Sequence, residues 1–279
     1  MDTTQIPNDK EIALIVGGTQ GIGFALVKNL LEGKSASFFP SDGLVIATAR
    51  DPKSPLLIEL QKQYPKRLFI ELVDVQHENS IEDFIQVMNT KYPRVDLYIH
   101  NSGVVLDDKT SQTSGKLDTK AYMTTHMINV LAPSAIFYGL APLLDRTHLL
   151  KSGGLPSQLN KRPQPLSSDP KKDTTTFVRV LFISSIMGSM ELHTFFSAPI
   201  YRTSKAALNH VVKDMALTKR HLSINVMHPG YVTTTLTGGN GNIGPDESAD
   251  GILSQLSIEG YSINNMKSIL SYDGNHLPW

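Results

Sequence analysis

The stretch from Glu11 to Leu31 constrains the fold of this chain more than any other. An apolar run, EIALIV, ends in the glycine-rich turn GGTQGIG, and FALVKNLL follows with helical periodicity. A buried strand, a tight turn and a helix in this order expose backbone N–H groups and the positive end of a helix dipole, which together bind anions. Glycine is needed where a side chain would block a pyrophosphate. The stretch predicts a nucleotide-binding unit, with an ordinary turn as the alternative.

Apolar runs of strand length alternate with helical patterns along the chain. Further strands are predicted at 44–49, 68–73, 95–100, 177–183 and 223–227, with an edge strand at 267–272. Helical patterns occur at 80–88, 127–144 and 248–256. This alternation predicts parallel strands joined by right-handed crossovers. We therefore expect a single doubly wound α/β domain of the Rossmann type over residues 1–279, with a parallel sheet of about seven strands flanked by helices.

Polar or glycine residues stand at the carboxyl ends of the first four predicted strands. They are Gly17, Arg50, Asp74 and Asn101, and ligands of such sheets bind outside these strand ends. Arg50 occupies the position that faces the adenosine ribose, where an acid binds a free 2′-hydroxyl and an arginine accommodates a 2′-phosphate. Because Ala49 supplies no acid, Arg50 favours NADP over NAD. The alternative is a surface arginine that opens a loop.

The segment SAPIYRTSKAAL places Tyr201 and Lys205 on one face of a predicted helix. Pro199 suits the first turn of that helix, and Ser197 is expected to cap it. A nearby ammonium favours the phenolate and lowers a tyrosine pKa from its usual value of about 10. The pair could therefore work as an acid/base, although this spacing also occurs by chance in many helices.

Bulk properties exclude several classes of partner. The 26 basic and 26 acidic residues balance, and there is no cysteine. The absence of cysteine excludes thiolate metal sites. The balanced charge provides no basic surface excess of the kind that binds nucleic acid or an anionic membrane. The N-terminus does not resemble a secretory or transit peptide, so a cytoplasmic location is expected. Met127–Leu144 has nearly the length of a short membrane span, but prolines and polar residues interrupt it, which favours a helix buried against the sheet.

Three segments are predicted to be loops. Residues 151–176 are rich in Pro, Ser and Lys and predict a mobile surface insertion, with a domain linker as the alternative. Residues 34–43 predict a surface excursion. Gly239, Gly241 and Gly244 match a dinucleotide glycine pattern, but no strand precedes them directly and Pro245 follows, so we interpret GGNGNIG as a loop near the substrate mouth.

Several motifs occur in a fixed order along residues 11 to about 236. They are GGTQGIG after the first predicted strand, HNSG after the fourth, Asn129 in the buried helix, SSIMG after the fifth, YRTSK, and HPGYVTT after the sixth. With this ordered set the chain resembles the short-chain dehydrogenase/reductase family. Within that family, YRTSKAALN, GPDESADGIL and YDGNHLPW are most similar to the C-factor-like carbonyl reductase group.

The resemblance implies a role for each matching residue. Tyr201 would be the general acid/base, and Lys205 would lower its pKa and hold the nicotinamide ribose. Ser185, whose Ser-x-x-Gly pattern Gly188 completes, would bind the substrate oxygen, and Asn129 would support a proton relay through its backbone. The cofactor implied is NADP(H). Its binding residues would be Gly17, Thr19, Gln20, Gly21, Ile22 and Gly23 at the pyrophosphate, Arg50, Asp74, Val75, Asn101, Ser102 and Gly103 on the adenosine side, and Tyr201, Lys205, Pro229, Gly230, Val232 and Thr234 at the nicotinamide.

The chain departs from the family pattern near the glycine turn. Val16 stands where threonine is usual, and His100 and Ser102 replace residues of an Asn-Asn-Ala-Gly motif. These changes remove hydroxyl or amide contacts that brace the turn, so we expect them to affect loop rigidity more than catalysis. The interval from Ser185 to Tyr201 is also longer than usual, and the loop between them is expected to absorb the difference.

The expected reaction is NADPH-dependent reduction of a small-molecule carbonyl to an alcohol. Ser185 would stabilise the oxyanion while Tyr201 donates the proton. The alternatives are an NAD-dependent alcohol dehydrogenase and a cofactor-binding regulator without turnover.

The substrate pocket is not identified by the sequence. Five apolar or aromatic residues are equally consistent with a substrate pocket and with a buried loop: Met187, Met190, Phe195, Phe196 and Tyr231. His193 is expected at the surface. No metal site is expected, and the family's usual assembly would be a homodimer or homotetramer.

Overall fold

A single mixed sheet organises the chain. The computed structural model describes residues 6–7, 9–35, 37–107, 117–154, 178–194, 197–257 and 268–279. The sheet has eight strands in the order β3-β2-β1-β4-β5-β6-β7-β8, parallel except for the last pair. The strands are β1 (Ile12–Val16), β2 (Leu44–Ala49), β3 (Leu68–Leu72), β4 (Leu97–His100), β5 (Arg179–Ile183), β6 (Ser223–His228), β7 (Ile269–Ser271) and β8 (His276–Leu277).

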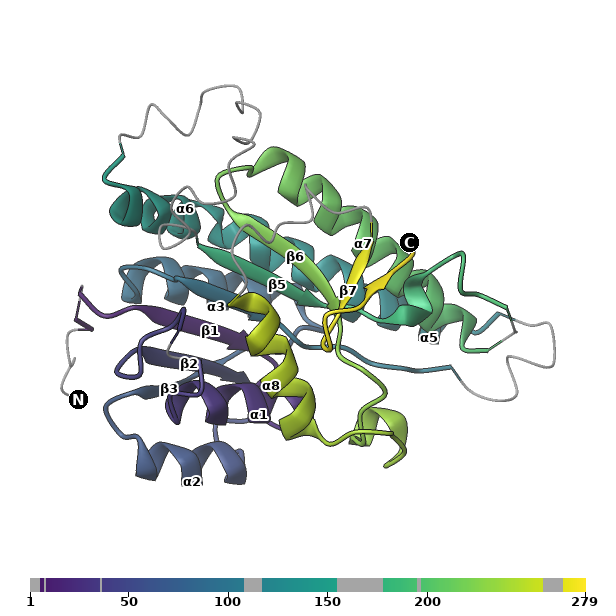
Figure 1. Ribbon diagram of the computed structural model, residues 1–279, viewed down its shortest axis with the longest axis horizontal. Coiled ribbons are helices and arrows are strands. Elements are labelled where there is room, and N and C mark those ends of the chain that lie inside the picture. Colours follow the sequence, from purple (N-terminus) through teal and green to yellow (C-terminus); the bar gives the residue numbers. More distant parts are fainter. Residues whose placement is uncertain are drawn as a thin grey trace.

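Helices connect the strands and cover both faces of the sheet. They are α1 (Gly21–Leu31), α2 (Pro55–Gln63), α3 (Glu78–Lys91), α5 (Thr119–His126), the π-helical turn η1 (Met127–Leu131), α6 (Ala132–Ser152), the 3-10 turns η4 (Ile186–Gly188) and η5 (Thr235–Thr237), α7 (Pro199–Thr218) and α8 (Pro245–Leu256). Helices α1 and α8 lie side by side on one face, and α6 and α7 lie on the other (Figure 1). The predicted doubly wound α/β fold is therefore confirmed.

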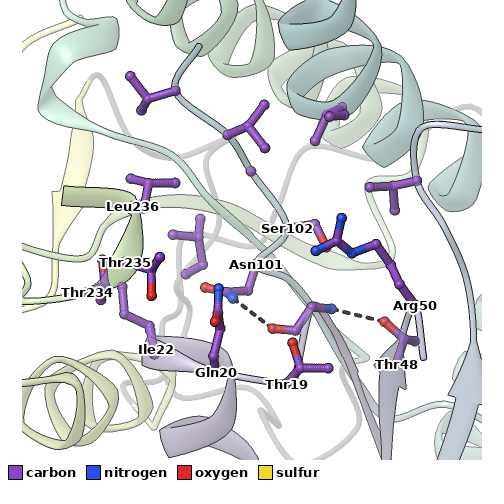
Figure 2. A pocket seen from close by; sticks show the side chains of 18 of the residues that line it. Thr19, Gln20, Ile22, Thr48, Arg50, Asn101, Ser102, Thr234, Thr235 and Leu236 are labelled. Atoms are coloured by element: carbon purple, nitrogen blue, oxygen red, sulfur yellow. Dashed lines mark hydrogen bonds between the residues drawn. The ribbon is translucent and has the colours of Figure 1, made fainter. Parts of the chain in front are cut away.

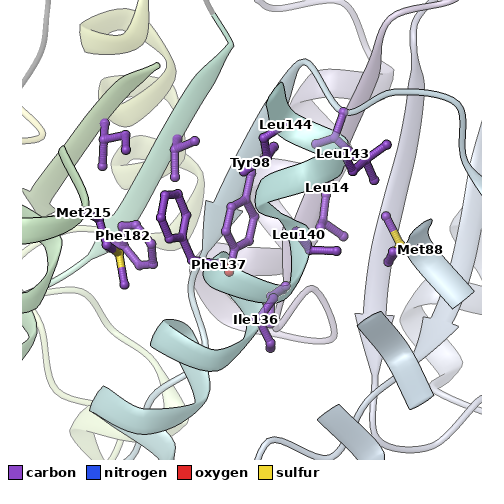
Figure 3. Close-up of a cluster of buried hydrophobic side chains, with 14 of the residues drawn as sticks. Leu14, Met88, Tyr98, Ile136, Phe137, Leu140, Leu143, Leu144, Phe182 and Met215 are labelled. Atoms are coloured by element: carbon purple, nitrogen blue, oxygen red, sulfur yellow. The ribbon is translucent and has the colours of Figure 1, made fainter. Parts of the chain in front are cut away.

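Two apolar cores lie on opposite faces of the sheet. The core under α3, α6 and α7 is built around Tyr98, Phe137 and Phe182, whose rings meet edge to face (Figure 3). The core under α1, α2 and α8 contains Leu26 and Leu253. Strands buried on both faces have near-continuous apolar sequences, which is why the central strands were predictable.

The topology places a crevice beside β1. This strand has β2 on one side and β4 on the other, so the chain leaves it in opposite directions along the sheet. Ligands of doubly wound sheets bind at such a switch point, outside the carboxyl ends of the strands. The glycine turn and the residues that follow β2 and β4 meet there.

The predicted buried helix is the middle of a longer one. Among the described residues, Thr119–Ser152 is long and apolar enough to cross a membrane by length and composition, but 56% of its most apolar window is buried inside the protein. Its apolar side chains, among them Ile136 and Leu140, belong to the core on the sheet. Helix α6 includes Lys151 and Ser152, and residues 155–177 lie outside the described residues, so the predicted insertion there stays a prediction.

Some elements differ from the sequence-based expectation. The connection 34–43 was predicted as a surface excursion, but Phe39 is only 2% exposed because its ring packs in the core near Gly43. The sheet has eight strands because β8 adds an antiparallel edge to β7. Helix α2 was not predicted, although Pro55 stands in its first turn.

Candidate functional site

A cavity of about 410 Å³ opens at the switch point beside β1 (Figure 2). Its walls contain most residues predicted to bind the cofactor: Gly17, Thr19, Gln20, Gly21, Ile22, Arg50, Asp74, Val75, Asn101, Ser102, Gly103, Tyr201, Lys205, Pro229 and Thr234. Its walls also contain residues that sequence reasoning missed: Thr48, Ala49, Val73, Gln76, Val104, Val105, Leu106, Ile128, Ile183, Ser184, Thr235 and Leu236. Most of the missed residues are neighbours of predicted ones at strand ends, and that adjacency was the available signal.

Three predicted cofactor residues stand outside the cavity wall. Gly23 lies beneath the glycine turn, and Gly230 has a left-handed backbone with a φ of 90°. Val232 is 3% exposed and bridges to Ile243. They shape the loops that form the cavity and do not line it.

Hydrogen bonds from two neighbouring strands brace the glycine turn. The N–H of Gly17 donates to Thr48 Oγ1 over 3.0 Å, and Asn101 Nδ2 donates to the carbonyl of Gly17 over 3.0 Å (Figure 2). Gly17 and Gly21 have φ values of 86° and 53°, which favour glycine. We expected the departures at Val16, His100 and Ser102 to weaken the bracing of this turn. Thr48 and Asn101 supply hydrogen bonds that brace it.

The start of α1 is suited to an anion. The N-cap residue Gln20 makes no capping hydrogen bond with its side chain to the described backbone, and the first turn contains no acidic residue. The N–H groups at this helix end have no partner within the helix and carry partial positive charge. Glycine at positions 17 and 21 keeps the approach to them free of side chains. The turn fits a pyrophosphate.

Arg50 supplies a cation at another part of the cavity wall. Its side chain is exposed, and it lies near Thr48 and Ser102 (Figure 2). Within the described ranges no carboxylate forms an ion pair with Arg50. The guanidinium is therefore open to a ligand anion.

Ser185, the N-cap of η4, meets Tyr201 and Lys205 of α7. Their exposed fractions are 7%, 8% and 3%. A hydrogen bond joins Ser185 to Tyr201. Lys205 Nζ donates to the carbonyl of Ile183 over 2.9 Å and lies 5.7 Å from the centroid of the Tyr201 ring. A hydroxyl, a phenol and an amine thus form one buried group, whose phenol and amine line the cavity while Ser185 does not.

Burial controls the protonation of this group. It raises the pKa of Tyr201 to about 12, against the opposing effect of the hydrogen bond with Ser185. It lowers the pKa of Lys205 to about 8. The prediction that Lys205 lowers the pKa of Tyr201 is therefore wrong for this arrangement, because desolvation of the phenolate dominates. Tyr201 therefore keeps its proton at neutral pH.

Asn129 connects helix α7 to the segment after β4. It lies in η1 with no exposed surface. Its side chain accepts from the N–H of Val104 and donates to the Val104 carbonyl, each over 2.9 Å. It also donates to Ser204 Oγ over 3.0 Å, and that hydroxyl donates to the carbonyl of Tyr201 over 2.7 Å. The side chain of Asn129 thus has a positioning contact that sequence reasoning did not find, while the backbone relay stays a prediction.

The cap of α7 differs from the expected one. Ser197 was predicted to cap the helix, but its oxygens accept from Arg202. The N-cap residue is Ala198, in a left-handed conformation with a φ of 42°. The capping carboxylate comes from Asp107, which accepts from the N–H groups of Ile200 and Tyr201. No local sequence pattern could reveal this contact.

His100 occupies a buried position beneath the site. Its Nδ1 lies 2.9 Å from the hydroxyl of Tyr98, and its ring stacks on Phe182. Burial, with a smaller effect of Lys205, lowers the pKa of His100 to about 3. The imidazole is therefore neutral and acts as part of the core.

The remaining candidate residues contribute little to the cavity. Met190 and Tyr231 are 77% and 51% exposed, and His193 is exposed as predicted. Met187 is half-buried and does not line the cavity. Phe195 and Phe196 lie outside the described residues. The described part of the chain contains no group of three or more histidine and acidic side chains that could hold a metal ion.

The second glycine pattern is not a nucleotide turn. Gly239 and Gly241 lie in the loop between η5 and α8, away from the cavity wall. A Cβ at Gly241 would lie 2.2 Å from the backbone nitrogen of Thr233, so this glycine permits close packing of the loop. Gly244 then forms the N-cap of α8.

Comparisons with known proteins point to one enzyme family. The model of the family described as short chain dehydrogenase matches residues 11–150. An uncharacterized oxidoreductase of Schizosaccharomyces pombe is 26% identical over 96% of this chain and 98% of its own length. The C-signal protein of Myxococcus xanthus is 33% identical, over 36% of this chain and 61% of that protein. The NADPH-bound crystal structure of carbonyl reductase from chicken fatty liver has a TM-score of 0.75 and 25% identity, over 97% of this chain and 99% of that one.

Proposed function

This chain belongs to the short chain dehydrogenase family, and from that premise we propose that it reduces a ketone or aldehyde to an alcohol with NADPH. The observation that carries the proposal is the buried group of Ser185, Tyr201 and Lys205, of which Tyr201 and Lys205 line the glycine-turn cavity. Consumption of NADPH by the purified protein, measured on a panel of diketones and aromatic aldehydes, tests it. Tight NADPH binding without turnover on that panel would overturn it.

The glycine turn supports a dinucleotide cofactor. The backbone at Gly21 and Ile22 begins α1, lines the cavity and would hold the pyrophosphate. Asp74 and Val75 would border the adenine. Lys205 and Tyr201 would hold the nicotinamide ribose, with Asn101, Ser102 and Gly103 along the wall between. When bound, NADPH would supply the hydride.

The side chains of the catalytic group each have a proposed task. Tyr201, whose pKa burial raises to about 12, holds the proton that goes to the carbonyl oxygen. Ser185 donates a hydrogen bond to the same oxygen as negative charge develops there. Lys205, held by the carbonyl of Ile183, keeps an amine beside the phenol. The low exposure of the group keeps water away from it.

Arg50 is proposed to select NADPH over NADH. Arg50→Ala should weaken NADPH binding by about 10- to 100-fold, since a hydrogen bond to a charged group contributes about 1.5–3 kcal/mol. NADH binding should change little because it lacks the 2′-phosphate. The measurement is the dissociation constant of each cofactor by fluorescence titration. Lys53→Ala is the control, because Lys53 is an exposed cation outside the cavity wall. Tighter binding of NADH by the wild type would instead favour the NAD-dependent alcohol dehydrogenase.

A regulator that binds the cofactor without turnover is the second candidate function. The partial likeness to the C-signal protein is the observation that favours it. The buried Ser185, Tyr201 and Lys205 favour the enzyme, because a sensor needs none of their chemistry. The carbonyl panel separates the two functions.

We also propose that the protein forms a homodimer through the α5–α6 helix. Met123, Leu131 and Tyr138 are 67%, 48% and 50% exposed along this continuous helix. Exposed apolar side chains gathered along one element are typical of association surfaces. Light scattering after gel filtration should give the mass of a dimer, and Leu131→Glu should shift it towards a monomer. A wild-type monomer at high protein concentration would contradict the proposal.

A further inference from the structure

Asp107 caps the catalytic helix from a distant part of the chain. Its Oδ1 accepts from the N–H of Ile200 over 2.8 Å, and its Oδ2 accepts from the N–H of Tyr201 over 2.9 Å. Both groups belong to the first turn of α7, where N–H groups have no acceptor within the helix. One carboxylate therefore satisfies two backbone donors, one of them on the catalytic tyrosine itself.

The start of α7 needs an external cap. Ala198 is the one non-glycine residue with positive φ in the described part of the chain, and it makes no capping hydrogen bond with its side chain. The left-handed conformation costs free energy for any residue that carries a Cβ. Ser197 is occupied with Arg202. Asp107 thus compensates a strained helix entry with a charge that suits the positive end of the helix dipole.

Asp107 also ends a segment of the cavity wall. Val104, Val105 and Leu106 line the cavity, and Leu106 is 39% exposed. The amide of Asn129 holds Val104 at one end of this segment, and the contact of Asp107 with α7 holds the other. Movement of Tyr201 relative to this wall would break a hydrogen bond at one of the two ends.

We propose that Asp107 is a positioning residue that holds Tyr201 at a fixed position relative to residues 104–106 of the cavity wall. The proposal rests on the function proposed above, because it assigns Asp107 a task in the proton transfer from Tyr201. The carboxylate does not touch the reacting atoms. It acts through the backbone of Tyr201, and its loss leaves the phenol in place for a smaller fraction of the time.

The first test compares two helix-capping aspartates. Asp107→Ala should lower kcat for carbonyl reduction by about 10- to 100-fold, since small misplacements of a catalytic group cost up to about 10²-fold. The NADPH dissociation constant should stay near the wild-type value. Asp107→Asn should be intermediate, because the amide oxygen can still accept one N–H. Asp118→Ala is the matched control: Asp118 caps α5 by accepting from the N–H of Ala121 over 3.0 Å and is exposed. It should keep wild-type kcat.

The second test does not depend on turnover. Amide hydrogen exchange of the free protein should become faster in the peptide 197–208 of Asp107→Ala, while the peptide covering α1 exchanges as in the wild type. Asp118→Ala should leave both peptides unchanged. Wild-type exchange in 197–208 of Asp107→Ala overturns the inference, even if the protein turns out to reduce no carbonyl. Wild-type kcat in an active Asp107→Ala protein overturns it equally.

Discussion

Tyr201→Phe is expected to lower kcat for carbonyl reduction by about 10²- to 10⁴-fold, the usual contribution of a general acid. The substitution removes the hydroxyl and keeps the ring, which is 8% exposed and packed beside Lys205. Because burial raises the pKa of Tyr201 to about 12, the wild-type phenol holds its proton throughout the neutral range. The measurement is NADPH consumption at saturating aldehyde. NADPH affinity, followed by fluorescence, should fall by no more than about 10-fold, since one hydrogen bond to the nicotinamide ribose contributes about 0.5–1.5 kcal/mol.

Tyr231→Phe is the matched control for this prediction. It removes the same hydroxyl from a tyrosine that is 51% exposed and does not line the cavity. Its kcat should equal that of the wild type. If Tyr201→Phe keeps the wild-type rate, Tyr201 is not the proton donor and the proposed mechanism fails, whatever the cofactor affinity.

The central sheet was predictable because its strands are buried on both faces. Leu44–Ala49 was predicted residue for residue, and β1 differs from its prediction only at the ends. Such strands need apolar residues at every position, which gives a strong local signal. The antiparallel edge strand β8 has only two residues, too few for any period to show. Helix boundaries were less accurate, since α5, η1 and α6 join into one helix whose polar ends carry no core pattern.

The site was predictable where function requires particular residue types at particular strand ends. Gly17, Arg50 and Asn101 all line the cavity because the topology brings the carboxyl ends of parallel strands together. Contacts set by tertiary packing were not predictable. Asp107 reaches Tyr201 across 94 residues, and local rules assigned the cap to Ser197 instead. The pKa of Tyr201 depends on its burial in the folded protein, and the spacing of residues along a helix does not predict burial.

Gly23→Ala is the second change for which we expect a large effect. Gly23 does not have a positive φ, so an alanine could adopt the same backbone conformation. The obstacle to alanine is a steric clash of its Cβ with neighbouring atoms. A Cβ there would lie 2.0 Å from the carbonyl oxygen of Gly17 and 2.6 Å from Nδ2 of Asn101. Helix α1 must then move away from the glycine turn, which breaks the hydrogen bond from Asn101 to the carbonyl of Gly17. Overpacking of this kind costs about 1–3 kcal/mol of unfolding free energy.

The same displacement should weaken cofactor binding, because Gly23 sets the distance between the turn and the start of α1. We expect an NADPH dissociation constant about 100-fold higher, equivalent to about 2.8 kcal/mol, measured by calorimetric titration beside a urea unfolding curve. Gly244→Ala is the control, since Gly244 has a φ of −84° and a Cβ there would meet nothing within 4 Å. It should change neither quantity. Wild-type NADPH affinity in a folded Gly23→Ala protein would mean that the glycine turn is not the pyrophosphate site, and the anion would then have to bind elsewhere in the cavity.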